Sequence, residues 1–120
     1  MYYVYLMRCS DDSLYCGITT DLYRRFEEHT NKDNPKGAKY THAKEVISIA
    51  AAWQTESGRS EASKLEAKLK KLPKAKKEIL CEAPERLYDF YDGEQVFIAV
   101  GAQTVGEEAH RLLFRIQRHV

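Results

Sequence analysis

Arg25 and His29 are four residues apart, so on a helix their side chains share one face. A guanidinium matches phosphate oxygens in pairs, and an imidazole can donate a hydrogen bond or transfer a proton near neutral pH. This pair therefore predicts a face that binds an anion. The alternative is that Arg25 pairs in solvent with Asp21 or Glu28, which is the more common arrangement for a single arginine.

Glu66 interrupts an apolar stripe on a second predicted helix. At 100° per residue its side chain lies flush with the stripe formed by Ala62, Leu65, Leu69 and Leu72. An ionised carboxylate facing a core costs several kcal/mol unless it is paired, hydrogen-bonded or bound to a metal. Glu66 is therefore either a metal ligand or a glutamate at the edge of the stripe, paired with a nearby lysine or arginine.

Tyr5 and Tyr15 lie on two adjacent predicted strands, although tyrosines most often serve simply as packing residues. Side chains alternate between the two faces along a strand, so the odd-numbered Tyr5 and Tyr15 share a face only if odd-numbered residues pair with odd-numbered residues across the hairpin. The numbers of each pair then sum to an even value, and the loop must contain an odd number of residues. We predict a loop of three or five residues around Asp11–Ser13. Asp12 is the candidate for positive φ, because the turn contains no glycine.

The order of predicted elements is ββαβαα, typical of an α/β (α+β) domain with a small, mixed, three-stranded sheet flanked by helices. The first strand has two apolar faces and should be central. Thr19, Thr20 and Asp21 cap the first helix, Pro73 separates the second from the third, and the segment 31–44 is a loop. The predicted strands are 2–9, 14–18 and 46–53, and the helices end near residues 30, 72 and 82.

After Pro84 the pattern changes to one further strand, 95–102, and one amphipathic helix, 106–119. A single strand and helix cannot form a core of their own, so we expect them to pack on the first part. The expected organisation is thus a domain over residues 1–83 with an extension over 84–120.

The composition fits one soluble domain: 120 residues, 43% hydrophobic and 31% charged. Residues 1–82 carry fifteen basic and twelve acidic side chains, a net charge of +3, whereas residues 83–120 carry a net −2. The ten residues 68–77 contain six lysines and no acid. The positive electrostatic field of these lysines would attract phosphate, although a run of lysines is more often just the solvated face of a helix.

The three cysteines, Cys9, Cys16 and Cys81, have neither disulfide-framework nor zinc-site spacing, and we interpret them as small core residues. The sequence contains no apolar run of the ~20 residues that a membrane-spanning helix needs, and the N-terminus has no secretory pattern. We therefore expect a protein of the reducing cytoplasm.

Taken together, Tyr3-Val4-Tyr5, Tyr15-Cys16-Gly17, Arg25, His29 and Glu66 resemble the GIY-YIG nuclease family. The similarity covers about residues 2–82 and includes YCGITTDLYRRFEEH, KGAKYT and SEASKLEAKLKKL. Within the family the chain is most similar to the small stand-alone bacterial members.

The resemblance implies a metal-dependent endonuclease that hydrolyses DNA, with branched or damaged DNA as a candidate substrate and RNA not excluded. By motif position the catalytic residues are Tyr5, Tyr15, Arg25, His29 and Glu66. Glu66 would hold one Mg²⁺ or Mn²⁺, Tyr15 would accept a proton from the attacking water, and Arg25 would neutralise phosphate charge. Tyr5 and His29 would orient the water or the phosphate. The expected nucleic-acid contacts are Lys36, Lys39, Tyr40, Lys68, Lys70, Lys71 and Lys74.

The sequence departs from the family pattern at four positions. Tyr3 replaces a glycine, Val4 and Cys16 replace isoleucines, and Ile18 stands where some members have lysine. The last change leaves one cation fewer near the metal. Two other functions stay open: a catalytically weak nucleic-acid-binding module with the same basic face, and a protein-interaction domain that docks through its tail.

Overall fold

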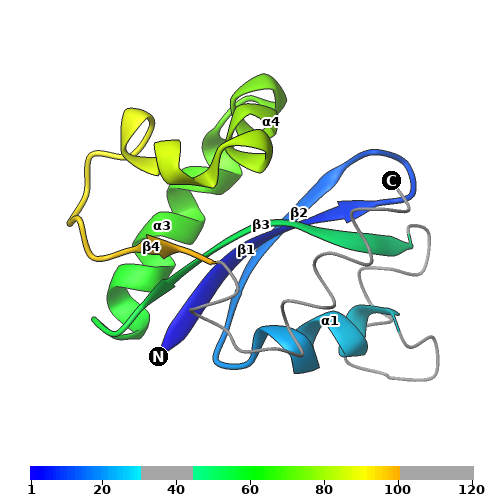
Figure 1. The fold of residues 1–120 in the computed structure, drawn as a ribbon, viewed down its shortest axis with the longest axis horizontal. Coiled ribbons are helices and arrows are strands. Elements are labelled where there is room, and N and C mark those ends of the chain that lie inside the picture. Colours follow the sequence, from blue (N-terminus) through cyan, green and yellow to red (C-terminus); the bar gives the residue numbers. More distant parts are fainter. Residues whose placement is uncertain (31–44, 101–120) are drawn as a thin grey trace.

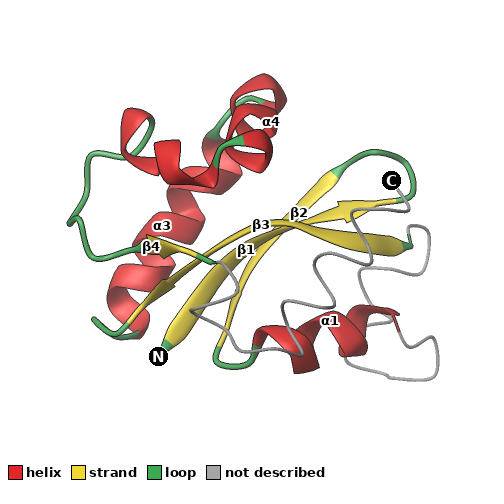
Figure 2. Ribbon diagram, in the orientation of Figure 1, coloured by secondary structure: helices red, strands yellow, loops and turns green. Residues whose placement is uncertain are grey.

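The computed structural model describes residues 1–30 and 45–100. Its elements follow the predicted order, which confirms the α/β class (Figures 1 and 2). No helix within these ranges is both long enough and apolar enough to cross a membrane. The elements are β1 (Tyr2–Cys9), β2 (Leu14–Thr19), α1 (Leu22–Thr30), β3 (Val46–Thr55), α3 (Arg59–Lys71), α4 (Lys74–Glu82), the 3₁₀ helix η1 (Pro84–Asp89) and β4 (Ile98–Ala99).

The strands form one sheet in the order β2-β1-β3-β4, with β1 central as expected. Each of the three pairings is antiparallel, which corrects the expectation of a mixed sheet. The reason is that β2 and β3 run in the same direction but are separated by β1, which pairs antiparallel with both. The connection through α1 therefore joins parallel strands that are not neighbours.

The two faces of the sheet carry separate clusters of apolar side chains. Val4 and Leu6 of β1 pack with α3, whereas Tyr5 and Met7 pack with α1. The two helices consequently cover opposite faces (Figure 1). Because both faces of β1 are buried, the strand needs apolar residues at odd and even positions alike, as its sequence predicted.

The β1–β2 hairpin has the geometry that its sequence predicted. The Cys9 amide donates to the Ser13 carbonyl at 2.9 Å, so three residues, 10–12, form the loop. Asp12 has φ 70°, as a three-residue loop with a left-handed third position requires. In this register Tyr5 pairs with Gly17, and the odd-numbered residues of both strands share the face covered by α1.

The chain after α4 packs on the face that α3 covers. Leu87, Tyr91 and Phe97 join the cluster around α3, and the indole N–H of Trp53 donates to the Pro84 carbonyl at 2.7 Å. The division of the chain at residue 83 stays a prediction. The helix expected over residues 106–119 lies outside the described residues.

The fourth strand is shorter than the predicted range 95–102. Within the described residues it comprises only Ile98 and Ala99, which pair with Gln54 and Trp53 of β3. The tyrosine hydroxyl of Tyr88 accepts a hydrogen bond from the Phe97 amide at 2.9 Å and donates to the Glu94 carbonyl at 3.3 Å.

Candidate active site

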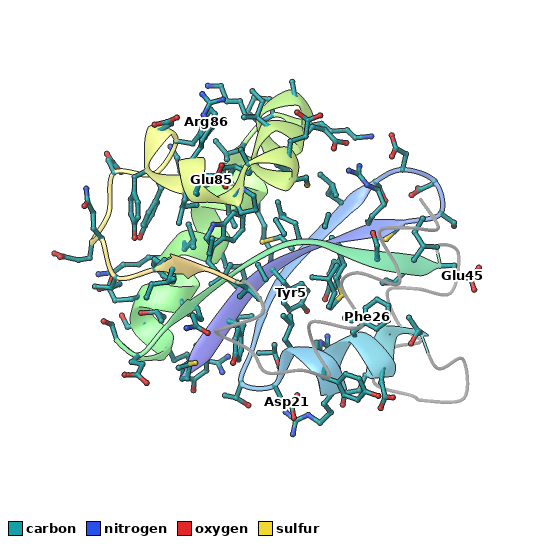
Figure 3. All side chains as sticks on the ribbon, viewed as in Figure 1. Tyr5, Asp21, Phe26, Glu45, Glu85 and Arg86 are labelled. Atoms are coloured by element: carbon teal, nitrogen blue, oxygen red, sulfur yellow. The ribbon has the colours of Figure 1, made fainter. Side chains whose placement is uncertain are left out.

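The start of α1 is set by Asp21, as expected for a capping residue. Its carboxylate accepts a hydrogen bond from the Arg24 amide at 3.0 Å, and its own amide donates to the Thr19 hydroxyl at 3.1 Å. Leu22 and Phe26 then pack on the sheet. This anchoring presents Arg25 to the same sheet face as Tyr5. Figure 3 shows Tyr5 between the sheet and α1, the helix that carries Phe26.

Arg25 is the centre of a polar cluster on this face. Its Nε donates to the Tyr5 hydroxyl at 3.3 Å and its Nη1 to Glu28 Oε1 at 3.2 Å. Burial disfavours the guanidinium charge, but hydrogen bonds with Tyr5, Glu28 and Tyr15 outweigh this effect, so the pKa of Arg25 is raised. Arg25 thus makes the expected pairing with Glu28, and in addition it touches both motif tyrosines.

Tyr5 is completely buried, and its ring crosses the backbone of Gly17 on the neighbouring strand. A Cβ atom at residue 17 would lie 2.6 Å from the Cζ of Tyr5 and closer still to its hydroxyl. Burial is the main cause that raises the pKa of Tyr5, so its phenol stays protonated at neutral pH. Gly17 is therefore required for the close approach of Tyr5 and not for backbone conformation.

Tyr15 joins Tyr5 and His29 in one aromatic group. Its ring centroid lies 6.1 Å from that of Tyr5 and 4.9 Å from that of His29, both in edge-to-face arrangements. Unlike Tyr5, Tyr15 is only half-buried. Of the two phenols, that of Tyr15 is therefore the one that solvent or a substrate can reach.

His29 is 4% exposed, and neither ring nitrogen has a hydrogen-bond partner within the part of the chain described. Burial, followed by the charge of Arg25, lowers the pKa of His29 to about 4. The imidazole is consequently neutral at physiological pH and supports the Tyr15 ring by packing.

This burial predicts a pH dependence of stability. Between about pH 6.5 and pH 4 the unfolded chain binds a proton at His29 that the folded protein excludes, so the free energy of unfolding falls as the pH is lowered. The full loss attributable to His29 is about 3 kcal/mol. Urea unfolding of the wild type and of His29→Phe at pH 7 and pH 4.5 measures it. An equally steep loss in both proteins would contradict this assignment.

Glu66 lies on α3 and therefore on the other side of the sheet from these four side chains. Its backbone carbonyl accepts a hydrogen bond from the Cys16 thiol at 3.8 Å, beside Tyr15 in the edge strand β2. Burial and then the charge of Glu66 raise the pKa of Cys16 to about 12. The negative charge of the Glu66 carboxylate is therefore felt at the edge strand β2.

The Glu66 side chain is 23% exposed, and its carboxylate lies 3.4 Å from the Nζ of Lys70. This is the pairing that the alternative interpretation expected. In residues 1–30 and 45–100 no three His, Cys, Asp or Glu side chains are grouped to hold a metal ion. A single accessible carboxylate still fits Mg²⁺, which keeps most of its waters and is bound by one or two carboxylates plus substrate phosphates.

The described lysines of the expected nucleic-acid surface are all exposed: Lys68, Lys70, Lys71 and Lys74. Lys70 pairs with Glu66, and the Nζ of Lys74 lies 3.2 Å from Asp12 of the hairpin loop. No such ion pair is formed by Lys68 or Lys71 within the described ranges. Lys36, Lys39 and Tyr40 lie outside the described residues.

Two residues gain a role that the sequence analysis did not assign. In the sequence Gly17 is only part of a motif. A three-residue loop over residues 10–12, however, pairs residue 5 with residue 17, so the contact of Gly17 with Tyr5 follows from the loop length. Glu28 was considered only as a solvent partner of Arg25, but its side chain is 13% exposed and holds the guanidinium in the cluster. Its position three residues after Arg25 is the signal that was available.

Residues 1–78 match the model of the GIY-YIG catalytic domain. A UPF0213 protein of Fusobacterium nucleatum is 42% identical over 84 residues, which cover 70% of this chain and 80% of the relative. A UPF0213 protein of Vibrio cholerae is 40% identical over 86 residues, covering 72% and 82% of the two chains. One from Halobacterium salinarum is 40% identical over 80 residues, covering 67% and 99%. No solved structure matches the chain significantly.

The family match covers the whole ββαβα unit that carries both motif tyrosines, Arg25 and Glu66. GIY-YIG domains are nuclease-type hydrolases and generally depend on a divalent metal, and their substrate is nucleic acid. The names of the UPF0213 relatives state no activity. The chain therefore belongs to the GIY-YIG nuclease family and is similar to its UPF0213 members.

Proposed function

We propose that the protein is a cytoplasmic endonuclease that hydrolyses DNA phosphodiester bonds with Mg²⁺ or Mn²⁺, acting on branched or damaged DNA. The observation that carries this proposal is the contact of one guanidinium, that of Arg25, with both motif phenols, Tyr5 and Tyr15. A packing role alone would not require a half-buried arginine at the junction of two tyrosines, because isolated polar groups are costly to bury.

In this proposal Tyr15 and Arg25 act directly on the substrate. The half-buried Tyr15 side chain, acting as the phenolate, accepts the proton of the attacking water and becomes the neutral phenol. The water oxygen bonds to phosphorus as the bond to the 3′ oxygen breaks, and the leaving 3′ oxygen takes a proton from solvent. Arg25 donates hydrogen bonds to the phosphate oxygens, where negative charge accumulates in the transition state. The structure supports these roles because both side chains are partly exposed on the same face.

Tyr5 and His29 are assigned positioning roles because they are buried. Tyr5 accepts the hydrogen bond from Arg25 Nε and fixes the direction of the guanidinium. The His29 ring packs against the edge of Tyr15. Both side chains would thereby hold the reacting groups in place without touching the water, since fixing reacting groups removes much of the entropic cost of reaction.

Glu66 is the proposed metal ligand. A divalent ion bound there would polarise the scissile phosphate and stabilise the leaving oxygen. Glu66 on α3 and Tyr15 on β2 flank the edge strand of the sheet from opposite faces. The proposal therefore requires the phosphate to lie at the outer edge of β2, where both side chains have access to it.

The exposed lysines of α3 and α4 would contact the DNA backbone beside this edge. Neutralising phosphates releases counterions, so DNA binding should weaken steeply with salt and depend little on sequence. Lys68 and Lys71 are the strongest candidates, since neither forms an ion pair within the described residues.

A catalytically weak nucleic-acid-binding module is the second candidate function. The observation that favours it is the position of Glu66, which is paired with Lys70 and separated by the sheet from the phenol cluster. Such a module would bind DNA in a salt-dependent manner without cleaving it.

A metal titration of cleavage tests the proposal. Purified protein is incubated with a branched DNA duplex and increasing Mg²⁺, in parallel with Glu66→Gln and with Glu82→Gln, an exposed acid of α4. We expect Glu66→Gln to raise the Mg²⁺ concentration for half-maximal cleavage at least tenfold, because it removes the protein's anionic ligand. Glu82→Gln should match the wild type, and EDTA should stop the reaction.

The outcomes separate the alternatives. Binding without cleavage by any of the three proteins would contradict the nuclease and favour the binding module. Equal dependence of cleavage on the Mg²⁺ concentration in Glu66→Gln and the wild type would contradict the assignment of Glu66 as the metal ligand. Cleavage of a matched branched RNA at the same rate would contradict the assignment of DNA as the substrate.

A further inference from the structure

A pocket of about 450 Å³ that includes none of the candidate active-site residues lies between α3 and the segment that joins η1 to β4. Glu61 and Lys64 line it from α3, and residues 91–95 line it from the connecting segment, which runs beside α3 in Figure 1. The lining carries three carboxylates, those of Glu61, Asp92 and Glu94, against the single ammonium of Lys64. The pocket is therefore net negative, in contrast to the lysine-rich half of α3.

One polar atom of this pocket is buried without a hydrogen-bond partner within the described residues. Glu61 Oε1 lies 3.1 Å from the Nζ of Lys64, but Glu61 Oε2 has no donor. Because an unpaired buried polar group costs free energy, Glu61 Oε2 indicates that a hydrogen-bonding ligand completes the pocket. Tyr91, which is 7% exposed, adds an aromatic ring and a hydroxyl to the same lining.

The ring of Tyr91 forms part of the pocket wall beside Gly93. The ring lies over Gly93, where a Cβ atom would be 2.7 Å from Tyr91 Cε2 and closer to the hydroxyl. Burial and then the charge of Glu61 raise the pKa of Tyr91, so the phenol stays neutral and lies within the field of that carboxylate. Glu61, Tyr91 and Gly93 all line the same pocket.

The chemistry of the lining selects the ligand. The pocket offers no multidentate metal cage, since no three acidic, His or Cys side chains are grouped as metal ligands among residues 1–30 and 45–100. A guanidinium does fit, because it is planar, carries five N–H donors and stacks on aromatic rings while pairing with carboxylates. An ammonium has fewer donors and no flat face, so it would satisfy Glu61 and Tyr91 less well.

We propose that this pocket binds the guanidinium group of an arginine side chain presented by a protein partner. The rim residues Asp92, Glu94 and Gln95 are exposed, so the pocket is open at the surface. Sites for free small molecules usually enclose most of their ligand, whereas an open acidic pocket suits one side chain of a larger molecule. The proposal is independent of DNA cleavage, because none of the pocket residues belongs to the candidate active site.

The test follows backbone amide shifts by NMR while the full-length ¹⁵N-labelled protein is titrated with Nα-acetyl-arginine N-methylamide. We expect saturable shifts at Glu61, Lys64 and residues 91–95. The citrulline analogue, in which a neutral urea replaces the guanidinium, should produce none of them. Glu61→Gln should weaken binding about tenfold, as expected for the loss of a hydrogen bond to a charged group. Glu85→Gln, an exposed acid of η1 outside the pocket, is the matched control.

Tyr91→Phe provides a second variant that keeps the ring and removes only the hydroxyl. It should weaken binding several-fold, and it decides the question if Glu61→Gln does not fold. Absence of saturable shifts, equal shifts with the citrulline analogue, or unchanged affinity in the folded variants would overturn the proposal. Binding of free L-arginine more than tenfold tighter than the capped derivative would overturn the assignment to a polypeptide side chain.

Discussion

Replacing Arg25 with lysine is expected to lower the rate of DNA cleavage by about 10²–10³-fold, the range found when one donor to a transition-state charge is removed. Lysine keeps the positive charge but not the fork through which Nε reaches Tyr5 while Nη1 reaches Glu28. An ammonium can rotate freely and holds neither the phenol nor the phosphate in a single direction. Single-turnover cleavage of the branched duplex measures the effect.

Arg24→Lys is the matched control, because Arg24 is the preceding residue of α1 and its side chain is exposed. This variant should cleave at the wild-type rate, and both variants should keep the same DNA affinity at low salt. If Arg25→Lys cleaved as fast as Arg24→Lys, the guanidinium fork would have no part in the reaction. If Arg25→Lys lost DNA affinity instead of rate, Arg25 would be a binding residue.

Replacing Gly17 with alanine is expected to slow cleavage about 100-fold and to destabilise the fold by about 1–3 kcal/mol. The new Cβ would lie 2.6 Å from Tyr5 Cζ, so the phenol must move away from β2. Tyr5 is completely buried and has little room to move. Its displacement would break the contact with Arg25 and shift the adjoining ring of Tyr15.

Ala52→Gly tests whether a substitution that only destabilises a neighbouring strand also slows cleavage. Ala52 is the partner of Tyr5 on β3, opposite Gly17 on β2. This substitution costs about 0.5–1 kcal/mol of strand stability but places no atom against the phenol. Cleavage at a temperature where both variants are folded should therefore fall only in Gly17→Ala. Similar losses of activity in the two variants would contradict the steric explanation.

The local features of the fold could be predicted because each depends on neighbouring residues. The two apolar faces of residues 2–9 require a central strand, and β1 is central. The odd hairpin loop follows from placing Tyr5 and Tyr15 on one face, and the three-residue loop with Asp12 at φ 70° confirms it. The capping role of Asp21 was likewise evident from its side-chain type.

Other features depend on contacts between distant segments. β3 contains two register shifts against β1, after Leu6 and after Arg8, which the alternation of its residues does not reveal. β4 pairs with β3 through only Ile98 and Ala99 within the described residues, although the strand pattern begins at residue 95. A strand pattern in the sequence shows only that a segment suits a sheet, whereas contacts with the neighbouring strand decide how far it pairs.

The family, the order of elements and the candidate residues could be predicted from the amino-acid sequence, because motif spacing and side-chain periodicity are local properties. Three features required the folded chain: Tyr5 is buried beneath Gly17, Arg25 joins the two phenols, and Glu66 approaches β2 from the opposite face. Periodicity states which residues share one face of a helix or strand. Which face of the sheet each helix covers depends on the path of the connections and on packing across the whole sheet.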